Sequence, residues 1–234
     1  MTRQSTLSTL GAGAVAAWPI CLGYIPIGLA LGVLARQTGF SPLDIGLMSL
    51  CVFAGSAQFI AVAMIGQGAA PAAIILTTLI VNFRHLLMSS ALAVHLRGSS
   101  RRFLFLFGYG ITDESFALNM VRFRSDWDPW RALALNQVAN ATWIVSTIIG
   151  ALAGSLIPAG AYGIDFALPA MFIALLVTQL QSRLHIITAV LALSVSTLWA
   201  LLLPGNSYAL AAAIIAASGG FLLKRLGKKS WGLG

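Results

Sequence analysis

The chain has 234 residues, of which 59% are hydrophobic and only 9% are charged, and its mean hydropathy is +0.90. Soluble domains carry about 25% charged residues, so this composition excludes an ordinary soluble domain and indicates an all-α polytopic membrane protein. The net charge of +8 does not indicate a nucleic-acid partner, because the basic residues fall in short runs between apolar segments. Cys21 and Cys51 lie inside apolar runs and predict neither a disulfide nor a metal site, and no cofactor is expected.

Several apolar runs are long enough to cross a bilayer, which takes about 20 helical residues. In the first of them, Pro19 and Pro26 predict a kink or break near the middle of the run. A shorter run at 103–121 predicts a re-entrant or short helical segment, with a full crossing as the alternative. The sequence therefore predicts seven transmembrane helices plus this segment, or else eight spans. The predicted spans are 11–35, 43–66, 70–95, 132–156, 166–182, 184–203 and 207–223.

The distribution of basic residues predicts the orientation, because cytoplasmic loops are enriched in Lys and Arg. With the N-terminus outside and 103–121 re-entrant, Arg3 is the only basic residue outside and Arg84 lies in the membrane. An eight-span topology would move four of the cytoplasmic arginines outside, so we favour the first arrangement, with a cytoplasmic C-terminus. The residues then predicted to be cytoplasmic are Arg36, Arg97, Arg101, Arg102, Arg122, Arg124, Arg131, Arg183, Lys224, Arg225, Lys228 and Lys229.

A faint internal repeat relates the two halves of the chain. Residues 32–35 read Gly-Val-Leu-Ala, residues 150–153 read Gly-Ala-Leu-Ala, and each is followed by a loop, an aspartate and an apolar run containing Phe. Three predicted crossings separate the copies, which would make the repeat inverted, as in many transporters with broken helices. The single membrane domain 1–234 then comprises a first repeat at about 11–95, the segment 103–121, a second repeat at about 132–203, and a C-terminal helix and basic tail at 207–234.

The centre of the run 43–66 is polar, because residues 53–59 read Phe-Ala-Gly-Ser-Ala-Gln-Phe. A glutamine at the bilayer midplane has four hydrogen-bonding positions and no water unless the protein admits it. Gln58 could simply join two helices. Alternatively, Gly55 and Ser56 could allow the backbone to unwind around a substrate. With Asn82, the candidate substrate-binding residues are Phe53, Gly55, Ser56, Gln58, Phe59 and Asn82.

Arg84 lies at the middle of the predicted span 70–95, about 15 Å from either surface and too deep to reach water along the membrane normal. An arginine there is costly and must face protein or a water-filled path. Asp113 and Glu114 are the candidate partners, either as a structural ion pair or as part of the substrate path. His85 adds a neighbouring titratable group, so Arg84, His85, Asp113 and Glu114 form the candidate ion-pair or coupling group.

Three motifs together resemble the AzlC family, the large subunits of branched-chain amino acid exporters. They are residues 53–59, Asn-Phe-Arg-His at 82–85, and Thr-Asp-Glu-Ser-Phe at 112–116, supported by Ile-Asp-Phe-Ala at 164–167. The resemblance runs from about Trp18 to Leu203. It implies export of valine, leucine, isoleucine and related apolar amino acids across the cytoplasmic membrane, together with a small AzlD-type membrane subunit.

Two other classes of function compete with a transporter. A membrane enzyme would need Ser56 and His85 to act as nucleophile and base, but the sequence has no Gly-x-Ser-x-Gly or His-Glu-x-x-His pattern. A passive channel is less consistent with sparse polar residues and proline-broken helices than alternating access is. We therefore expect no enzymatic activity and a transporter, driven by protons or another ion.

Overall fold

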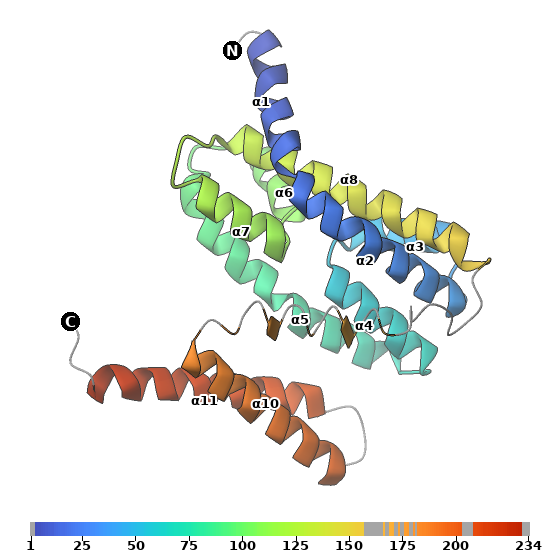
Figure 1. The fold of residues 1–234 in the computed structure, drawn as a ribbon, viewed down its shortest axis with the longest axis vertical. Helices are drawn as coiled ribbons and strands as arrows, with labels where there is room; N and C mark the ends of the chain where they lie inside the picture. Colours follow the sequence, from blue (N-terminus) through green and yellow to red (C-terminus); the bar gives the residue numbers. More distant parts are fainter. Residues whose placement is uncertain are drawn as a thin grey trace. The chain divides into compact units, whose positions relative to one another are not determined.

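The computed structural model describes residues 3–156, 166, 169–170, 173, 176–177, 180, 182–202 and 208–230, which form helices and turns with no strand among them. The predicted span at 166–182 therefore lies almost wholly outside the described residues. The chain divides into two units, Met1–Pro169 and Ala170–Gly234 (Figure 1). Among the described residues, four helices are long and apolar enough to cross a membrane: Trp18–Gln37, Pro71–His95, Pro129–Gly154 and Arg183–Leu202.

Unit one is built on a close pair of long helices, α2 (Trp18–Gln37) and α8 (Pro129–Gly154). Helix α1 (Arg3–Ala16) leads into α2 with only Ala17 between them, and α2 then runs through Pro26 without interruption. The break predicted near the middle of the first span therefore comes earlier, beside Trp18 and Pro19. In this first turn of α2 a proline costs no hydrogen bond, because a backbone N–H there would have no partner within the helix.

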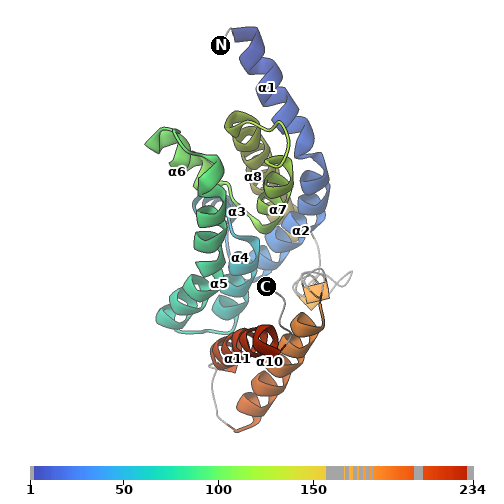
Figure 2. The same cartoon turned by 90° about the vertical axis from the view of Figure 1, so that its left-hand side faces the viewer.

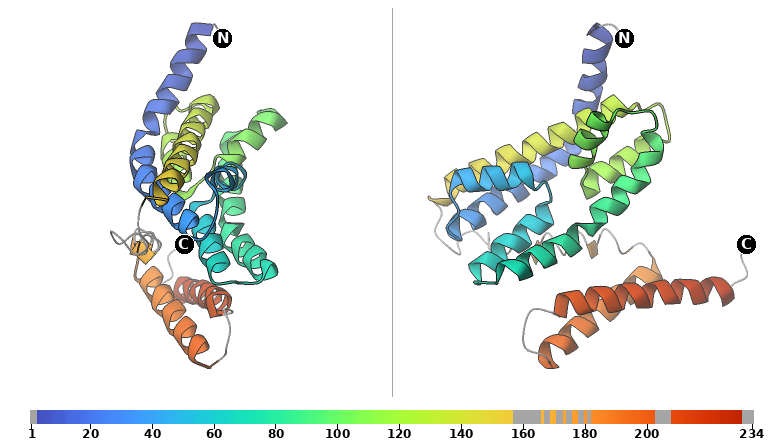
Figure 3. Two further views of the ribbon diagram at one scale, coloured as in Figure 1. Left: turned by 90° about the vertical axis from the view of Figure 1, so that its right-hand side faces the viewer. Right: turned by 180° about the vertical axis from the view of Figure 1, so that it is seen from behind.

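Helices α2 and α8 run parallel, because residues later in α2 contact residues later in α8 (Figures 1 and 3). A Cβ added to Gly32 or Gly150 would overlap a backbone carbonyl oxygen of the other helix, so only glycine permits this approach. The glycine segments predicted to form an inverted repeat are thus parallel neighbours, and the prediction is wrong for them. The contacts pair Gly13 with Arg131, Gly28 with Ser146, Gly32 with Thr147, Gly150 with Leu29, and Gly154 with Arg36.

The predicted span 43–66 is two half-length helices, α3 (Pro42–Cys51) and α4 (Gly55–Gly66), separated by a non-helical stretch at 52–54. Helix α3 runs back along α8, and α4 returns to where it began, since a Cβ on Gly66 would lie 3.2 Å from Thr38 at the end of α2. The chain is non-helical directly before Gly55, whereas Gly55 and Ser56 themselves begin α4, and the single crossing is wrong. The length of the apolar run cannot distinguish one crossing from two half-crossings.

Helix α5 (Pro71–Leu92) runs the full length of unit one in the opposite direction to α8 and ends in the short turn η1 (Ala93–His95). Figure 2 shows it on the far side of the unit from α2. The C-terminal part of α5 packs in an apolar cluster with the start of α8 and with the two helices that follow α5 in the chain. The buried members of that cluster are Met88, Leu92, Leu96, Phe103, Phe107, Ile111, Ala132 and Leu133.

A second hairpin follows, α6 (Arg101–Tyr109) and α7 (Asp113–Arg122), as expected for the segment 103–121. Both helices have their outer ends near the start of α8, where Phe103 packs on Trp130 with ring centroids 5.0 Å apart. At the same end, Phe123 stacks on His95 with ring centroids 4.8 Å apart. This hairpin therefore enters unit one from the end opposite to the α3–α4 hairpin. We call the two ends the Thr38 end and the Arg131 end.

This path separates two groups of arginines that the sequence analysis placed together. Arg36 lies at the Thr38 end, against Gly154, whereas Arg131 lies at the opposite end, against Gly13. The predicted orientation, with Arg36 on the same side as Arg97 and Arg131, is therefore wrong. The reason is that one full-length helix, α5, lies between α2 and α8, instead of the two crossings predicted at 43–66 and 70–95.

Unit two contains α10 (Arg183–Leu202) and α11 (Tyr208–Ser230), packed on each other. A Cβ on Gly220 would lie 2.7 Å from Thr188 Oγ1, and one on Gly219 would lie 2.8 Å from Leu191 Cδ2. Since residue 188 faces 220 and residue 191 faces 219, the two helices run antiparallel.

Candidate functional site

The tips of the two hairpins meet inside unit one. Phe53 at the first tip and Tyr109 at the second lie with ring centroids 6.4 Å apart, and the Tyr109 hydroxyl donates to the Leu50 carbonyl oxygen. This bond satisfies one of the carbonyl groups that the end of α3 leaves free. Phe53 is buried and also packs edge-on against Tyr24 of α2, at 6.2 Å between centroids.

The first tip is held to α8 by a chain of neutral hydrogen bonds. Gln58 Nε2 donates to Ser49 Oγ at 3.0 Å, and Ser49 Oγ lies 2.9 Å from Thr147 Oγ1. The Trp143 indole donates to Gln58 Oε1 at 2.8 Å. Gln58 is only 1% exposed, and within the described part of the chain these two bonds leave one N–H and one acceptor position of its amide unused.

Gly55 is required at the start of α4 by the same tryptophan. A Cβ on Gly55 would lie 2.9 Å from the Trp143 ring, which is closer than ordinary contact. Ala54, the residue before α4, supplies no side-chain hydrogen bond to the helix terminus. The first N–H groups of α4 therefore point inward without a side-chain cap, while Phe59 packs in the core at 2% exposed.

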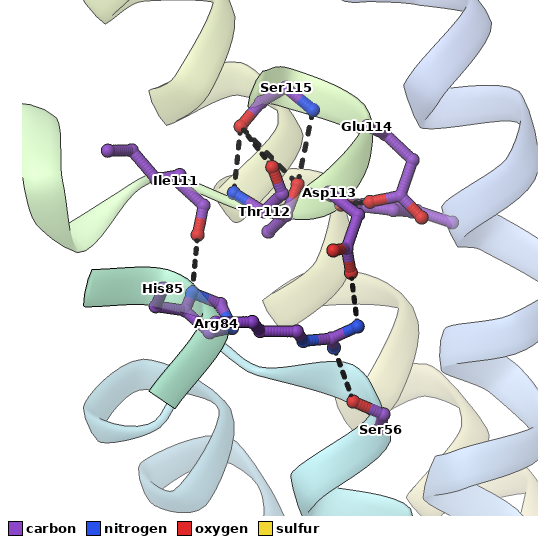
Figure 4. A network of polar contacts seen from close by, with 9 residues as sticks. Ser56, Arg84, His85, Ile111, Thr112, Asp113, Glu114 and Ser115 are labelled. Carbon is purple, nitrogen blue, oxygen red and sulfur yellow. Dashed lines mark hydrogen bonds and ion pairs between the residues drawn. The ribbon is translucent and has the colours of Figure 1, made fainter. Parts of the chain in front are cut away.

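The second tip carries the charges (Figure 4). Arg84 Nη1 of α5 lies 2.7 Å from Asp113 Oδ2, and its Nη2 donates to Ser56 Oγ at 2.5 Å. Of the two candidate partners, Asp113 thus makes the ion pair. The guanidinium joins the start of α7 to the start of α4, and so connects both hairpins to α5.

Glu114 has a different partner, Tyr24 of α2. The Tyr24 hydroxyl donates to Glu114 Oε2 at 2.7 Å and shares a hydrogen bond of 2.6 Å with Thr112 Oγ1. Thr112 and Ser115 form a reciprocal cap at the start of α7. Asp113 and Glu114 lie in the first turn, where negative charge is favoured by the helix dipole.

Three polar atoms on one stretch of α5 have no hydrogen-bond partner in the described structure, although each is buried. They are Asn82 Oδ1, Arg84 Nε and His85 Nε2. The other ring nitrogen of His85 lies 3.0 Å from the Ile111 carbonyl oxygen (Figure 4). Ser56 and His85 thus each bond elsewhere, to Arg84 and to Ile111, and this geometry does not make them a nucleophile and its base.

All ten residues singled out in the sequence fall in this one region of unit one, where the hairpin tips meet α5. Sequence reasoning missed Tyr24, Trp143, Thr147 and Ser49. Each is a single polar or aromatic residue within an apolar run, a signal shared with many residues that have no special role. Asn136 and Gln137, near the start of α8, donate to the Phe107 and Leu106 carbonyl oxygens and so join α8 to α6.

The AzlC protein family model matches residues 19–157, more than half of the chain. The chain belongs to the AzlC family. Every helix of the hairpin site lies within or overlaps the matched region. No solved structure matches the chain.

Relatives of this AzlC chain are membrane proteins. An uncharacterized membrane protein of Archaeoglobus fulgidus is 34% identical over 181 residues, covering 76% of this chain and 78% of the relative. Inner membrane protein YgaZ of Escherichia coli is 31% identical over 173 residues, covering 70% and 71%. Branched-chain amino acid transport protein AzlC of Bacillus subtilis is 29% identical over 192 residues, covering 81% and 75%.

Proposed function

We propose that this protein exports branched-chain and related apolar amino acids across the cytoplasmic membrane by alternating access. One observation carries the proposal: two half-length hairpins enter unit one from opposite ends, and their tips meet at Arg84, Ser56 and Asp113. Irregular backbone at membrane depth is tolerated where it lines a cavity or is covered by protein, and transporters bind substrates at such broken helices. The name of the Bacillus subtilis relative supports the substrate class.

An amino acid offers a carboxylate, an ammonium group and, in this case, an apolar side chain. The uncapped start of α4 and the guanidinium of Arg84 would bind the carboxylate, because the Arg84–Ser56 hydrogen bond places the guanidinium beside the start of α4. Asp113, Glu114 or the free Asn82 oxygen would accept from the ammonium group. Phe53, Gly55 and Gln58 would form the surrounding wall of this substrate site.

We propose fewer crossings than the seven or eight predicted from the sequence. The Arg131 end carries six arginines and the Thr38 end carries Arg36, so the Arg131 end is cytoplasmic by the positive-inside rule. The N-terminus is then cytoplasmic too. The arginines at or near that end are Arg97, Arg101, Arg102, Arg122, Arg124 and Arg131.

The rest of the chain continues this alternation. Crossings at α2, α5 and α8 would place residue 155 outside. With the span predicted from the sequence at 166–182 as the next crossing, α10 and α11 would complete the alternation and return Arg183 and Lys224 to the cytoplasm. Six crossings and two re-entrant hairpins therefore replace the seven spans and one re-entrant segment, and the C-terminus remains cytoplasmic.

Proton movement would drive export through the charged tip. The Arg84–Asp113 pair and the Tyr24–Glu114 contact each join a carboxylate of α7 to a different full-length helix. Exchange of the guanidinium for a proton at Asp113 would free α7 from α5. That release gives the alternating step a chemical trigger.

A small AzlD-type subunit would complete the transporter. The apolar face of α5 supports this, because Leu79, Phe83 and Leu87 are exposed on a span of which only 6% is buried within the chain. The glycines spaced four apart on α2 and α8 are not available to this partner, because they pack the two helices against each other. They are Gly28, Gly32, Gly150 and Gly154.

Flux in reconstituted vesicles tests the proposal. The purified chain, alone and with its AzlD-type subunit, should move leucine, isoleucine, valine and methionine across a sealed membrane but not glutamate or lysine. Arg84→Ala should abolish the flux, whereas Arg97→Ala, at an exposed arginine of the Arg131 end, should leave it intact. If neither composition moves any amino acid, the proposed function is wrong.

A further inference from the structure

A cavity of about 360 Å³ lies between α3, α4 and α5, beside the site described above. Most of its wall is aliphatic, from Met48 of α3, Val52 in the non-helical stretch after it, and Ile74 and Leu79 of α5. Two carboxamides, of Gln58 and Asn82, also line it. Its volume falls within the range of small-molecule sites, about 300–1,000 Å³, and its lining is of the usual kind, apolar with a few polar groups.

The polar groups of the cavity adjoin the charged site. Asn82 is two residues before Arg84 on α5, and Ala57, another lining residue, follows Ser56 on α4. The Asn82 Oδ1 atom is buried and has no hydrogen-bond partner in the described structure. A buried acceptor without a donor is costly, so this oxygen indicates that a donor belongs there.

We propose that this cavity holds the aliphatic side chain of the substrate, with Asn82 Oδ1 accepting a hydrogen bond from its ammonium group. The inference rests on the proposed transport function, and it assigns the selection of substrates by side-chain size to this cavity. An amino acid whose carboxylate lies at Arg84 and the start of α4 would place its side chain toward Met48, Ile74 and Leu79. The shape of the wall, not the charges, would then separate leucine from alanine.

The wall is incomplete within this chain, because Val52 is 41%, Ile75 67% and Leu79 63% exposed. A lipid chain is therefore the competing occupant. The two occupants differ in chemistry: a lipid chain has no ammonium group to offer Asn82 and does not discriminate among amino acids. The test must therefore measure selectivity as well as total flux.

Filling the cavity should invert the size preference. Ala61→Leu adds bulk to the α4 wall and should lower the ratio of leucine to alanine transport, expressed as kcat/KM, by about tenfold or more. The matched control, Ala73→Leu, adds the same bulk to α5 at an exposed position that does not line the cavity. This control should keep the parent ratio.

Asn82 gives an independent test of the ammonium contact. Asn82→Leu should lower kcat/KM for every amino acid by about tenfold or more, whereas Asn82→Asp, which keeps an acceptor, should recover most of it. Leucine should also raise the unfolding temperature of the detergent-solubilised parent, since a bound ligand stabilises the folded state. This rise should be lost in Ala61→Leu, which gives a readout without transport.

The outcomes separate the two proposals. If the parent moves no amino acid and leucine does not stabilise it, the proposed function fails. If the parent moves leucine but Ala61→Leu keeps the parent ratio, or if Asn82→Leu transports like the parent, the cavity is not the side-chain site and a lipid is its better occupant. A shifted ratio in Ala73→Leu as well would also contradict the assignment, because bulk outside the cavity would then suffice.

Discussion

The two hairpin tips differ in how their helices are terminated and in how they are held. The start of α4 has no side-chain cap, and its tip is tied to α8 through the neutral groups of Gln58, Ser49 and Trp143. The start of α7 is capped by its own Thr112 and Ser115 and is tied to α5 and α2 through charges. Neutral bonds suit a part that stays in place while it binds, and charged bonds suit a part that responds to a proton.

The largest loss of transport is expected from a substitution at the charged tip. Arg84→Ala removes the ion pair to Asp113 and the hydrogen bond to Ser56, each charge-assisted and worth about 1.5–3 kcal/mol. We discount the larger cost of a fully buried pair, because the two side chains are 30% and 33% exposed. Accumulation of leucine against a gradient should fall to background, while some leucine binding remains, measured by uptake and by binding to purified protein.

A double change sharpens this result. Arg84→Gln with Asp113→Asn removes both charges together and should restore folded yield better than Arg84→Ala, but not driven transport. Gradient-driven export by Arg84→Ala at the parent level would contradict the coupling role. A double variant that folds no better than the single one would contradict the ion pair itself.

At the neutral tip, Gln58→Leu and Trp143→Phe break the same hydrogen bond from opposite sides. Each should lower the free energy of unfolding by about 1–3 kcal/mol, because a buried partner is left unsatisfied. Gln58→Leu should in addition raise the apparent KM for leucine, by about tenfold for each 1.4 kcal/mol of binding lost. Equal KM values in the two variants would mean that Gln58 only joins helices.

The parallel packing of α2 and α8 supports both tips and can be weakened alone. Gly150→Ala places a methyl group against the Leu29 carbonyl oxygen and should cost about 1–3 kcal/mol of stability by overpacking. Gly23→Ala on α2 meets nothing within 4 Å and should be neutral or slightly stabilising, because alanine favours helix. Unfolding temperatures in detergent compare the two, and equal temperatures would contradict the close approach.

The smallest effect is expected at Tyr24. Tyr24→Phe removes the hydrogen bonds to Glu114 and Thr112 while keeping the ring between Phe53 and Trp143. Driven transport should fall by about tenfold, since a bond to the exposed Glu114 carboxylate lies at the low end of the range of about 1.5–3 kcal/mol for charged groups. A loss as large as that of Arg84→Ala would mean that Glu114, and not Asp113, is the main coupling carboxylate.

The sequence predicted the ingredients of the site better than the path of the chain. The unwound stretch before Gly55 and the partner group of Arg84 follow from residues that are too polar or too small for their depth in the membrane. The return of α4 to the Thr38 end does not follow, because a mainly apolar run such as 43–66 has the same composition whether it crosses once or folds back. Because of that one ambiguity, α2 and α8 were predicted to run in opposite directions, whereas they are parallel. The predicted inverted repeat and the side assigned to Arg36 were wrong for the same reason.

Residues that act only through their neighbours could not be predicted from the sequence either. Trp143 is decisive for Gly55 and Gln58, yet in the sequence it is one aromatic residue within an apolar helix. Its role depends on the parallel approach of α8 to the first hairpin. No local pattern encodes that approach.

The central claim, that two hairpins enter from opposite sides, is tested most directly by the sidedness of single cysteines. In a background lacking Cys21 and Cys51, cysteines at exposed Gln37 and Gln67 flank the α3–α4 hairpin, and one at exposed Ser125 follows the α6–α7 hairpin. An impermeant thiol reagent applied to intact cells should label Gln37→Cys and Gln67→Cys but label Ser125→Cys only after the membrane is permeabilised. Labelling of Gln37→Cys and Gln67→Cys on different sides would restore a single crossing at 43–66 and contradict the account.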